Sequence, residues 1–385
     1  MRRAFHHTFL ALLCAIPFSI AAAQALYAAA LLLWAALVVR ERRLEFTVPD
    51  LIMLAFFAVR LLTILLSEHP SASAAAFGRE VLFYPFYFIA VSYVRWFGRE
   101  GVMRAMTFSI AAIIVPSLYA VGNVLTGTTD RGASFSGGYT FFAVHSAVIL
   151  GFAAVLAADG PSPKLLRWLL PAALVIIAGL ISTYTRAMWL SAAAVVVVFA
   201  LLKERRLLYI ILPAAVIAFA AVPSLRERAV SLMDPLQNSS GRMELWTAAV
   251  ERIPLHPFLG YGPETFDEVI GDRSLLPDTR VGSWHSEFLQ VQVESGAAGS
   301  MLLLTLYVLP VWTAFRLRRS QHGDAPFGIR FVHFTFLAFI PAAAVGTVMA
   351  AILNGMLFKF VLAAASVLGA GAGVLPVRRI GREAA

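Results

Sequence analysis

Long apolar runs dominate this sequence and restrict how the chain can fold. A helix needs about 20 apolar residues to cross the hydrocarbon core of a bilayer, and several runs reach that length. The chain is 60% hydrophobic and 14% charged, whereas roughly a quarter of the residues in a soluble domain are charged. These features exclude a soluble globular fold. We expect an all-α polytopic membrane protein.

The apolar runs predict about twelve transmembrane helices. The first two are short and could form one tight hairpin. The basic and then apolar N-terminus also resembles a signal peptide, but further spans follow immediately, so we favour a transmembrane helix. The predicted spans are 8–22, 25–39, 48–66, 81–97, 104–125, 140–158, 166–182, 188–202, 207–223, 286–314, 331–352 and 357–376.

The basic residues predict the orientation of these spans. If the N-terminus is cytoplasmic, most of the 31 lysines and arginines fall in cytoplasmic loops, as the positive-inside rule requires. Both termini are then cytoplasmic. The net charge of +9 therefore reports topology, and we expect no nucleic-acid partner.

The predicted spans divide the chain into three parts. Residues 1–223 carry transmembrane helices 1–9, residues 224–284 form a large outer loop, and residues 285–385 carry transmembrane helices 10–12 and a short cytoplasmic tail. In the loop, "GRMELWTAAVERI" places Leu245, Trp246, Ala249, Val250 and Ile253 on one helical face. "PLHPFLGYGPETF" is rich in Pro and Gly, which favours a shaped turn. We expect a helical cap over the outer surface.

Several cations fall where topology does not require them. Arg60 and Lys359 lie inside predicted spans, and Arg131, Arg186 and Arg242 lie on the outer side. Such residues could anchor at lipid headgroups. Alternatively, the guanidinium groups could clamp a phosphate, which they bind through two parallel hydrogen bonds.

The stretch "GSWHSEFLQVQVESGAAGS" carries polar residues into the start of a predicted span. On a continuous helix His285, Leu289, Gln292, Gly296 and Gly299 share one face, which would point His285 into the bundle. The Gly296 and Ser300 spacing would let another helix pack closely.

Two interpretations of His285 remain open. A neutral imidazole can act as a general base, or it can be a hydrogen-bonded interfacial side chain beside Trp284. Glu287 is suited to a helix first turn. Glu294 is costly in a membrane unless an arginine or a backbone donor pairs with it.

Metal and cofactor binding find little support in the sequence. The single cysteine, Cys14, permits neither a disulfide nor a thiolate metal site. The pair His285 and Glu287 lacks the downstream PCxxC of zinc deaminases, and HExxH is absent. We expect no metal and no cofactor. An outer basic cavity with one histidine would suit a lipid-linked diphosphate.

Three stretches together resemble the O-antigen ligase family: "TYTRAMWLS", "GRMELWTAAVERIPLHPFLGYGPETF" and "WHSEFLQVQVESGAAGSMLLL". The resemblance implies a GT-C-like bundle with a periplasmic cap in the bacterial inner membrane. It implies metal-independent, inverting glycan transfer from undecaprenyl diphosphate to a sugar hydroxyl of lipid A-core. The sequence departs from the family pattern at Ser286, where Asn is common, and at Ser295.

The resemblance also implies residue roles. His285 would be the base or would orient the acceptor; apart from the resemblance, we expect Trp284 and Glu294 to be supporting residues. Arg186 and Arg242 would hold the diphosphate, and Arg131 is a weaker candidate for the same role.

Other functions stay open at this point. A polymerase that joins repeat units, with a growing glycan as its acceptor, would use the same donor. A protein glycosyltransferase is less favoured because we expect no soluble C-terminal domain. A transporter would suit about twelve helices, but the large outer loop and the lack of an evident repeat count against it.

Overall fold

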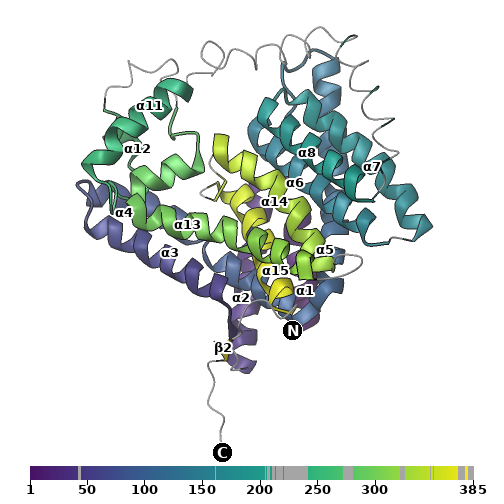
Figure 1. The fold of residues 1–385 in the computed structure, drawn as a ribbon, viewed down its shortest axis with the longest axis horizontal. Helices are drawn as coiled ribbons and strands as arrows, with labels where there is room; N and C mark the ends of the chain where they lie inside the picture. Colours follow the sequence, from purple (N-terminus) through teal and green to yellow (C-terminus); the bar gives the residue numbers. More distant parts are fainter. Residues whose placement is uncertain are drawn as a thin grey trace, which may run out of the picture.

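The computed structural model describes residues 1–41, 45–160, 162–203, 205, 209, 213, 220, 242–271, 281–320, 326–346, 348–349, 351–371 and 378–379. They fold into helices joined by turns (Figure 1). The helices are α1 (Arg2–Ala15), α2 (Ile20–Glu41), α3 (Val48–Leu65), α4 (Pro70–Val81), α5 (Pro85–Leu125), α6 (Tyr139–Ala158), α7 (Pro163–Ser182), α8 (Arg186–Lys203), α11 (Arg242–Arg252), the 3-10 helix η2 (Ile253–Leu255), α12 (Phe266–Ile270), α13 (Glu287–Ser320), α14 (Phe327–Val345) and α15 (Ile352–Gly371). Strands β1 (Glu45–Phe46) and β2 (Arg378–Arg379) form a two-residue antiparallel pair, the one strand pairing among these residues.

Eight described helices are long and apolar enough to cross a membrane: α2, α3, α5, α6, α7, α8, α13 and α14. The chain is therefore a multi-pass membrane protein, as predicted, but the described residues do not reach twelve spans. The predicted span 8–22 is wrong, because α1 ends at Ala15 and a turn that contains Pro17 leads into α2. Proline cannot donate the hydrogen bond that would continue the helix. The predicted span 207–223 lies largely outside the described residues.

Helix α5 contains the predicted span 104–125 and most of the predicted span 81–97, whose first residues lie in the end of α4 and the turn after it. Gly98 has a non-helical backbone (φ 58°, ψ −155°). The Tyr93 hydroxyl donates to the carbonyl of Gly101, 3.1 Å away, although eight residues of continuous helix rise about 12 Å. The chain therefore bends sharply at Gly98, and the two limbs of α5 correspond to the two predicted spans. Helix α4 was not predicted.

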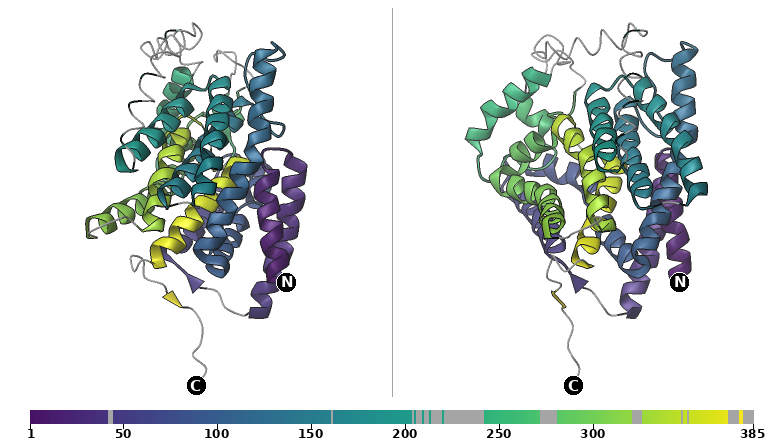
Figure 2. Two further views of the ribbon diagram at one scale, coloured as in Figure 1. Left: turned by 90° about the vertical axis from the view of Figure 1, so that its right-hand side faces the viewer. Right: turned by 45° about the vertical axis from the view of Figure 1, so that its right-hand side comes forward.

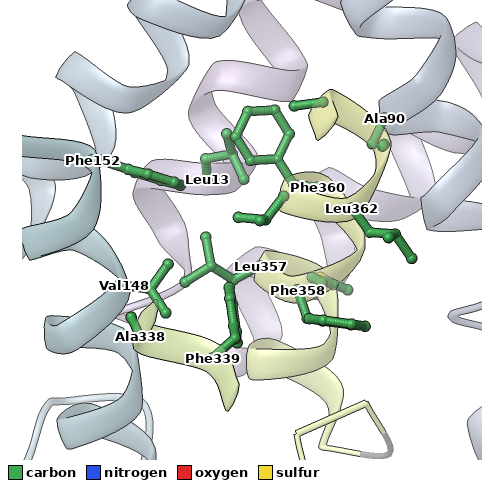
Figure 3. Close-up of a cluster of buried hydrophobic side chains, with 14 of the residues drawn as sticks. Leu13, Ala90, Val148, Phe152, Ala338, Phe339, Leu357, Phe358, Phe360 and Leu362 are labelled. Atoms are coloured by element: carbon green, nitrogen blue, oxygen red, sulfur yellow. The ribbon is translucent and has the colours of Figure 1, made fainter. Parts of the chain in front are cut away.

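Helix α15 forms the centre of the hydrophobic core. Its residues 353–366 are all buried. Figure 3 shows Leu357, Phe358, Phe360 and Leu362 surrounded by side chains from four other helices. These neighbours are Leu13 of α1, Ala90 of α5, Val148 and Phe152 of α6, and Ala338 and Phe339 of α14.

Helices α11 and α12 form a small cap beside α4 and α13 (Figure 1). In Figures 1 and 2 this cap lies at the opposite end of the molecule from the N-terminus. The predicted loop helix is confirmed as α11. Leu245 and Ala249 are buried as expected, but Val250 is 58% exposed. The cap has its own core, made of Leu245, Ala249, Tyr261, Phe266, Ile270, Trp284 and Val293.

Candidate functional site

The loop between α5 and α6 brings Arg131 towards the start of α8. The N–H of Gly132 donates to the carbonyl of Ser182 at the end of α7, 2.8 Å away. A Cβ on Gly132 would lie 2.1 Å from the Ser182 hydroxyl oxygen, so only glycine fits at this contact. Arg186 follows one tight turn later as the first residue of α8.

Tyr139, the first residue of α6, joins this arginine pair to the cap. The Arg131 guanidinium carbon lies 4.4 Å from the centroid of the Tyr139 ring. Burial is the main cause that lowers the pKa of Arg242; Tyr139 opposes this, and the like charge of Arg186 adds to it. Arg242 opens α11, so Tyr139 and Arg186, which are distant from it in the sequence, are near enough to act on it electrostatically. The structure thus brings together all three arginines that the sequence assigned to phosphate binding.

This arginine cluster, Arg131, Arg186 and Arg242, has the electrostatics of an anion site. All three side chains are partly buried, and like charges that share a poorly solvated site repel one another. Arg242 also stands at a helix N-terminus, where the helix dipole disfavours a cation. A phosphate group would relieve both effects, because it adds negative charge and accepts bidentate hydrogen bonds.

His285 does not lie on the helix face that the sequence predicted. Helix α13 begins at Glu287, and His285 precedes it with a positive φ of 49°. The prediction that Gly296 lets another helix pack closely is also wrong, because α13 is broken at that glycine. The periodic pattern is thus not one helical face. The His285 side chain is half-buried, and its position is set by the turn over residues 284–286.

Trp284 fixes this turn to the cap. Its side chain is fully buried and packs edge-on against Phe266, with ring centroids 4.8 Å apart. Its carbonyl accepts a hydrogen bond from the indole of Trp246, 3.1 Å away. Trp246 lies one turn along α11 from Arg242, a rise of about 6 Å. The arginine cluster and His285 are therefore joined through a single turn of α11.

The Gly-rich turn of the cap fills the break in α13. Gly296 has a non-helical backbone (φ 57°, ψ −159°), which leaves neighbouring backbone groups without helical partners. Residues 257–262 supply those partners through four hydrogen bonds. These are Tyr261 N–H to Val293 O (2.9 Å), Gly262 N–H to Glu294 O (2.9 Å), Ala297 N–H to Pro257 O (2.8 Å) and Ala298 N–H to Phe258 O (3.2 Å).

Glu294 has the arginine partner that its position required. Its carboxylate lies 2.9 Å from Arg60 of α3, and Arg60 also contacts Glu80 of α4 at 2.5 Å. All three side chains are buried. Arg60 thus neutralises acids inside the fold, which removes it as a phosphate-binding candidate.

Glu287 and Lys359 also have roles within the fold. The Glu287 carboxylate accepts from the N–H groups of Val348 and Met349, which precede α15. The Lys359 ammonium donates to the Met349 carbonyl, 3.3 Å away. The Glu287 carboxylate is therefore directed at the backbone before α15. In the described part of the chain, no group of three or more His, Cys, Asp or Glu side chains could hold a metal ion.

A comparison with known families agrees with the motifs. A family described as O-antigen ligase matches residues 171–304. This match supports an O-antigen ligase family. The family consists of glycosyltransferase-like ligases and polymerases, which implies lipid-linked glycan substrates. The O-antigen ligase match contains Arg186, Arg242, His285 and Glu294, whereas Arg131 precedes it. No curated protein matches the chain.

The sequence analysis left out three residues that organise this candidate site. Tyr139 lies against Arg131 and acts electrostatically on Arg242, but it has no motif around it. Glu80 and Gln290 hold Arg60 and Glu294 by hydrogen bonds. A buried carboxylate such as Glu294 requires a hydrogen-bond donor for each oxygen. This requirement could have predicted a nearby donor such as Gln290.

Proposed function

We propose that the chain transfers a glycan from undecaprenyl diphosphate to a sugar hydroxyl of lipid A-core at the periplasmic face of the bacterial inner membrane. The observation that carries the proposal is the arginine cluster around Tyr139. A lipid-linked diphosphate places an anionic head at the membrane surface and an apolar tail between helices, which suits such a cluster at the end of apolar helices.

The arginine cluster holds the diphosphate in this proposal. Arg186 and Arg242 each offer a planar fork of N–H donors that matches phosphate oxygens. Arg131 lies against Tyr139 and adds a third positive charge. During transfer the bond between the anomeric carbon and the diphosphate oxygen breaks, and both bonding electrons stay with the diphosphate. Fixed guanidinium groups stabilise this growing negative charge.

His285 is the general base in this proposal. The acceptor hydroxyl attacks the anomeric carbon from the side opposite the diphosphate, so the configuration inverts. The hydroxyl proton passes to the imidazole as the new glycosidic bond forms. Because diphosphate is already a good leaving group, the reaction proceeds without a metal ion.

A complementation assay tests the proposal directly. In a ligase-deficient cell we would compare the wild type with His285→Ala and Arg186→Ala, and read lipopolysaccharide ladders together with the accumulated lipid-linked donor. We expect the wild type to restore the ladders. We expect both variants to lose them while long-chain donor accumulates.

The same donor chemistry supports one alternative, a polymerase that joins repeat units onto a growing glycan. Members of the matching family include polymerases. If the wild type leaves the ladders absent, yet converts single-unit donor to long chains in a polymerase-deficient host, the acceptor assigned above is wrong.

A further inference from the structure

A buried chain of hydrogen bonds links Arg60 to the backbone next to His285. The Arg60 guanidinium donates to one oxygen of Glu294, 2.9 Å away. The Gln290 amide nitrogen donates to the other oxygen of Glu294. The Gln290 amide oxygen accepts from the N–H of Trp284, 2.9 Å away. We call Arg60, Glu294, Gln290 and the Trp284 N–H the Arg60 relay.

The polarity of the Arg60 relay follows from its two ends. A guanidinium and a backbone N–H are both donors only. Residue 294 must therefore present an acceptor to Arg60, and residue 290 must present an acceptor to the Trp284 N–H. In the contact between residues 290 and 294, one must donate and the other must accept. One carboxylate and one amide satisfy this requirement in either order. Two amides or two carboxylates leave one mismatched contact.

The relay is isolated from solvent. Arg60 is 2% exposed, Glu294 is 1% exposed and Gln290 is 6% exposed. A mismatched contact inside such a site keeps its full desolvation cost, because water cannot repair it. The relay can therefore hold the Trp284 N–H in one place.

The turn that the relay holds is strained at His285. The φ of 49° at His285 is uncommon for a residue other than glycine. Such a conformation persists only when its surroundings fix it. On one side the Trp284 carbonyl is bound by Trp246, and the Arg60 relay binds its N–H. On the other side Ser286 is buried and the N–H of Glu287 donates to the carbonyl of Gly346, 2.9 Å away.

We propose that Gln290, Glu294 and Arg60 are positioning residues that aim His285 at the acceptor by fixing the Trp284 backbone. This inference rests on the proposed role of His285. None of the three needs to contact substrate, because their effect passes through the turn.

The experiment changes the polarity of the relay and leaves its shape almost unchanged. The variants are Gln290→Met, Glu294→Gln and the exchange double variant Q290E/E294Q. Gln290→Met removes the link. Glu294→Gln makes two amides. The exchange variant restores one carboxylate and one amide in the opposite order, with the same net charge. Gln292→Met in the same segment is the matched control.

Two readouts are taken on full-length protein in detergent. The first is kcat and KM for glycan transfer from a lipid-linked donor. The second is hydrogen exchange of the peptide that covers residues 281–289, which does not depend on activity. A displacement of about 1 Å at a reacting group can cost roughly a hundredfold in rate.

We expect Gln290→Met and Glu294→Gln to lower kcat by roughly ten- to a hundredfold, with donor KM little changed and faster exchange at residues 281–289. We expect Q290E/E294Q to regain most of both losses and Gln292→Met to resemble the wild type. If either single variant fails to fold, the double variant and the other single variant still decide the matter.

Three results would contradict these statements separately. Faster exchange with unchanged kcat would show that the relay is structural and does not position His285. Failure of the double variant to regain protection, when the protein is folded, would overturn the relay polarity. Full activity of His285→Ala would overturn the proposed base. The hydrogen-exchange results would still test whether the relay holds residues 281–289 in place.

Discussion

Backbone strain marks the candidate site at the scale of single residues. Three described residues other than glycine have a positive φ: Tyr184 (52°), Glu264 (58°) and His285 (49°). Tyr184 lies two residues before Arg186, and His285 is the proposed base. Strained residues cluster at functional sites, where the surrounding fold stabilises them. His285 and Tyr184 agree with the motif positions His285 and Arg186, whereas Glu264 lies in the cap turn outside them.

The strain at His285 gives a prediction that distinguishes the effect of the backbone conformation on stability from the effect of the imidazole on catalysis. Asparagine tolerates the left-handed region better than most residues. We expect His285→Asn to unfold at the wild-type temperature in detergent, while its transfer rate falls as far as that of His285→Ala. Loss of general base catalysis costs roughly 10²- to 10⁴-fold. Near-normal turnover in His285→Asn would mean that the ring is not the base.

The arginine cluster gives a second prediction. Arg242→Lys keeps the charge but loses the planar fork of donors. We expect the donor KM to rise about tenfold, equivalent to roughly 1.4 kcal/mol. A transfer assay at fixed ionic strength measures this rise. The control is Arg167→Lys, which changes an exposed arginine near the start of α7. It should leave the donor KM unchanged. An equal effect in both variants would remove Arg242 from the donor site.

The sequence could name chemical types at these positions but not their partners. Arg131, Arg186 and Arg242 were identifiable as outer cations, and their convergence on Tyr139 depends on contacts between helices that are far apart in the chain. Glu294 was predicted to need a partner, and Arg60 lies 234 positions away. Packing decides which cation pairs with an acid, so the sequence could place Arg60 inside a span but could not identify Glu80 and Glu294 as its partners.

At the scale of elements, the contact between residues 257–262 and the break in α13 depends on two glycines. A Cβ on Gly260 would lie 2.4 Å from the Val293 carbonyl oxygen, and one on Gly296 would lie 2.3 Å from the Phe258 carbonyl carbon. Both glycines also have a positive φ. The sequence pattern at Gly296 suggested close packing of a second helix. In the structure the close neighbour is a turn of the cap.

We expect Gly296→Ala to destabilise the protein. The new Cβ would clash with the backbone of the cap turn, and the φ of 57° is unfavourable for alanine. Together these effects should lower the free energy of unfolding by about 1–3 kcal/mol. The unfolding temperature should fall, and proteolysis around residues 254–262 should become faster. Gly282→Ala is the control, because a Cβ there meets nothing within 4 Å. Equal stability of the two variants would contradict the observed contact.

Helix α13 consists of two segments that meet at Gly296, and hydropathy alone could not predict this division. A Cβ on Gly299 would lie 3.2 Å from a methyl group of Val291, although eight residues of continuous helix rise about 12 Å. Residues 287–295 therefore turn back towards residues 297–320. Mostly apolar residues continue on both sides of the bend, so hydropathy shows no interruption there. Only the cap turn, which supplies the missing hydrogen bonds, shows where the helix stops.

At the scale of the whole molecule, the structure and the charge pattern lead to a topology that can be measured. The cap and the N-terminus lie at opposite ends (Figures 1 and 2). The charge pattern places the N-terminus in the cytoplasm. Together these observations predict that the cap and the arginine cluster face the periplasm.

A labelling experiment tests this topology. The chain has one cysteine, Cys14, so Cys14→Ser gives a cysteine-free background. Asp130 and Ser162 are both exposed and lie at the two ends of the segment that contains α6. We expect Asp130→Cys to react with an impermeant maleimide in intact spheroplasts, and Ser162→Cys to react only after lysis. The reverse result would place the arginine cluster on the cytoplasmic side.

The general architecture was more predictable than its exact spans. Hydropathy identifies segments that avoid water, so the multi-pass membrane fold and most helix positions followed from the apolar runs. It cannot distinguish a span from a buried helix or from a bend. That is why 81–97 and 104–125 meet in one bent element, and why the short α1 was assigned a full span.

The turn that completes α13 has a consequence for how the chain is made. Residues 257–262 are synthesised before α13, and they supply the partners for its interrupted backbone. A segment that enters a bilayer alone must satisfy its own hydrogen bonds, which favours an unbroken helix. We therefore expect the bend at Gly296 to form only once residues 257–262 lie beside it and can supply those partners. The order in which the segments are made would then contribute to how the candidate site is assembled.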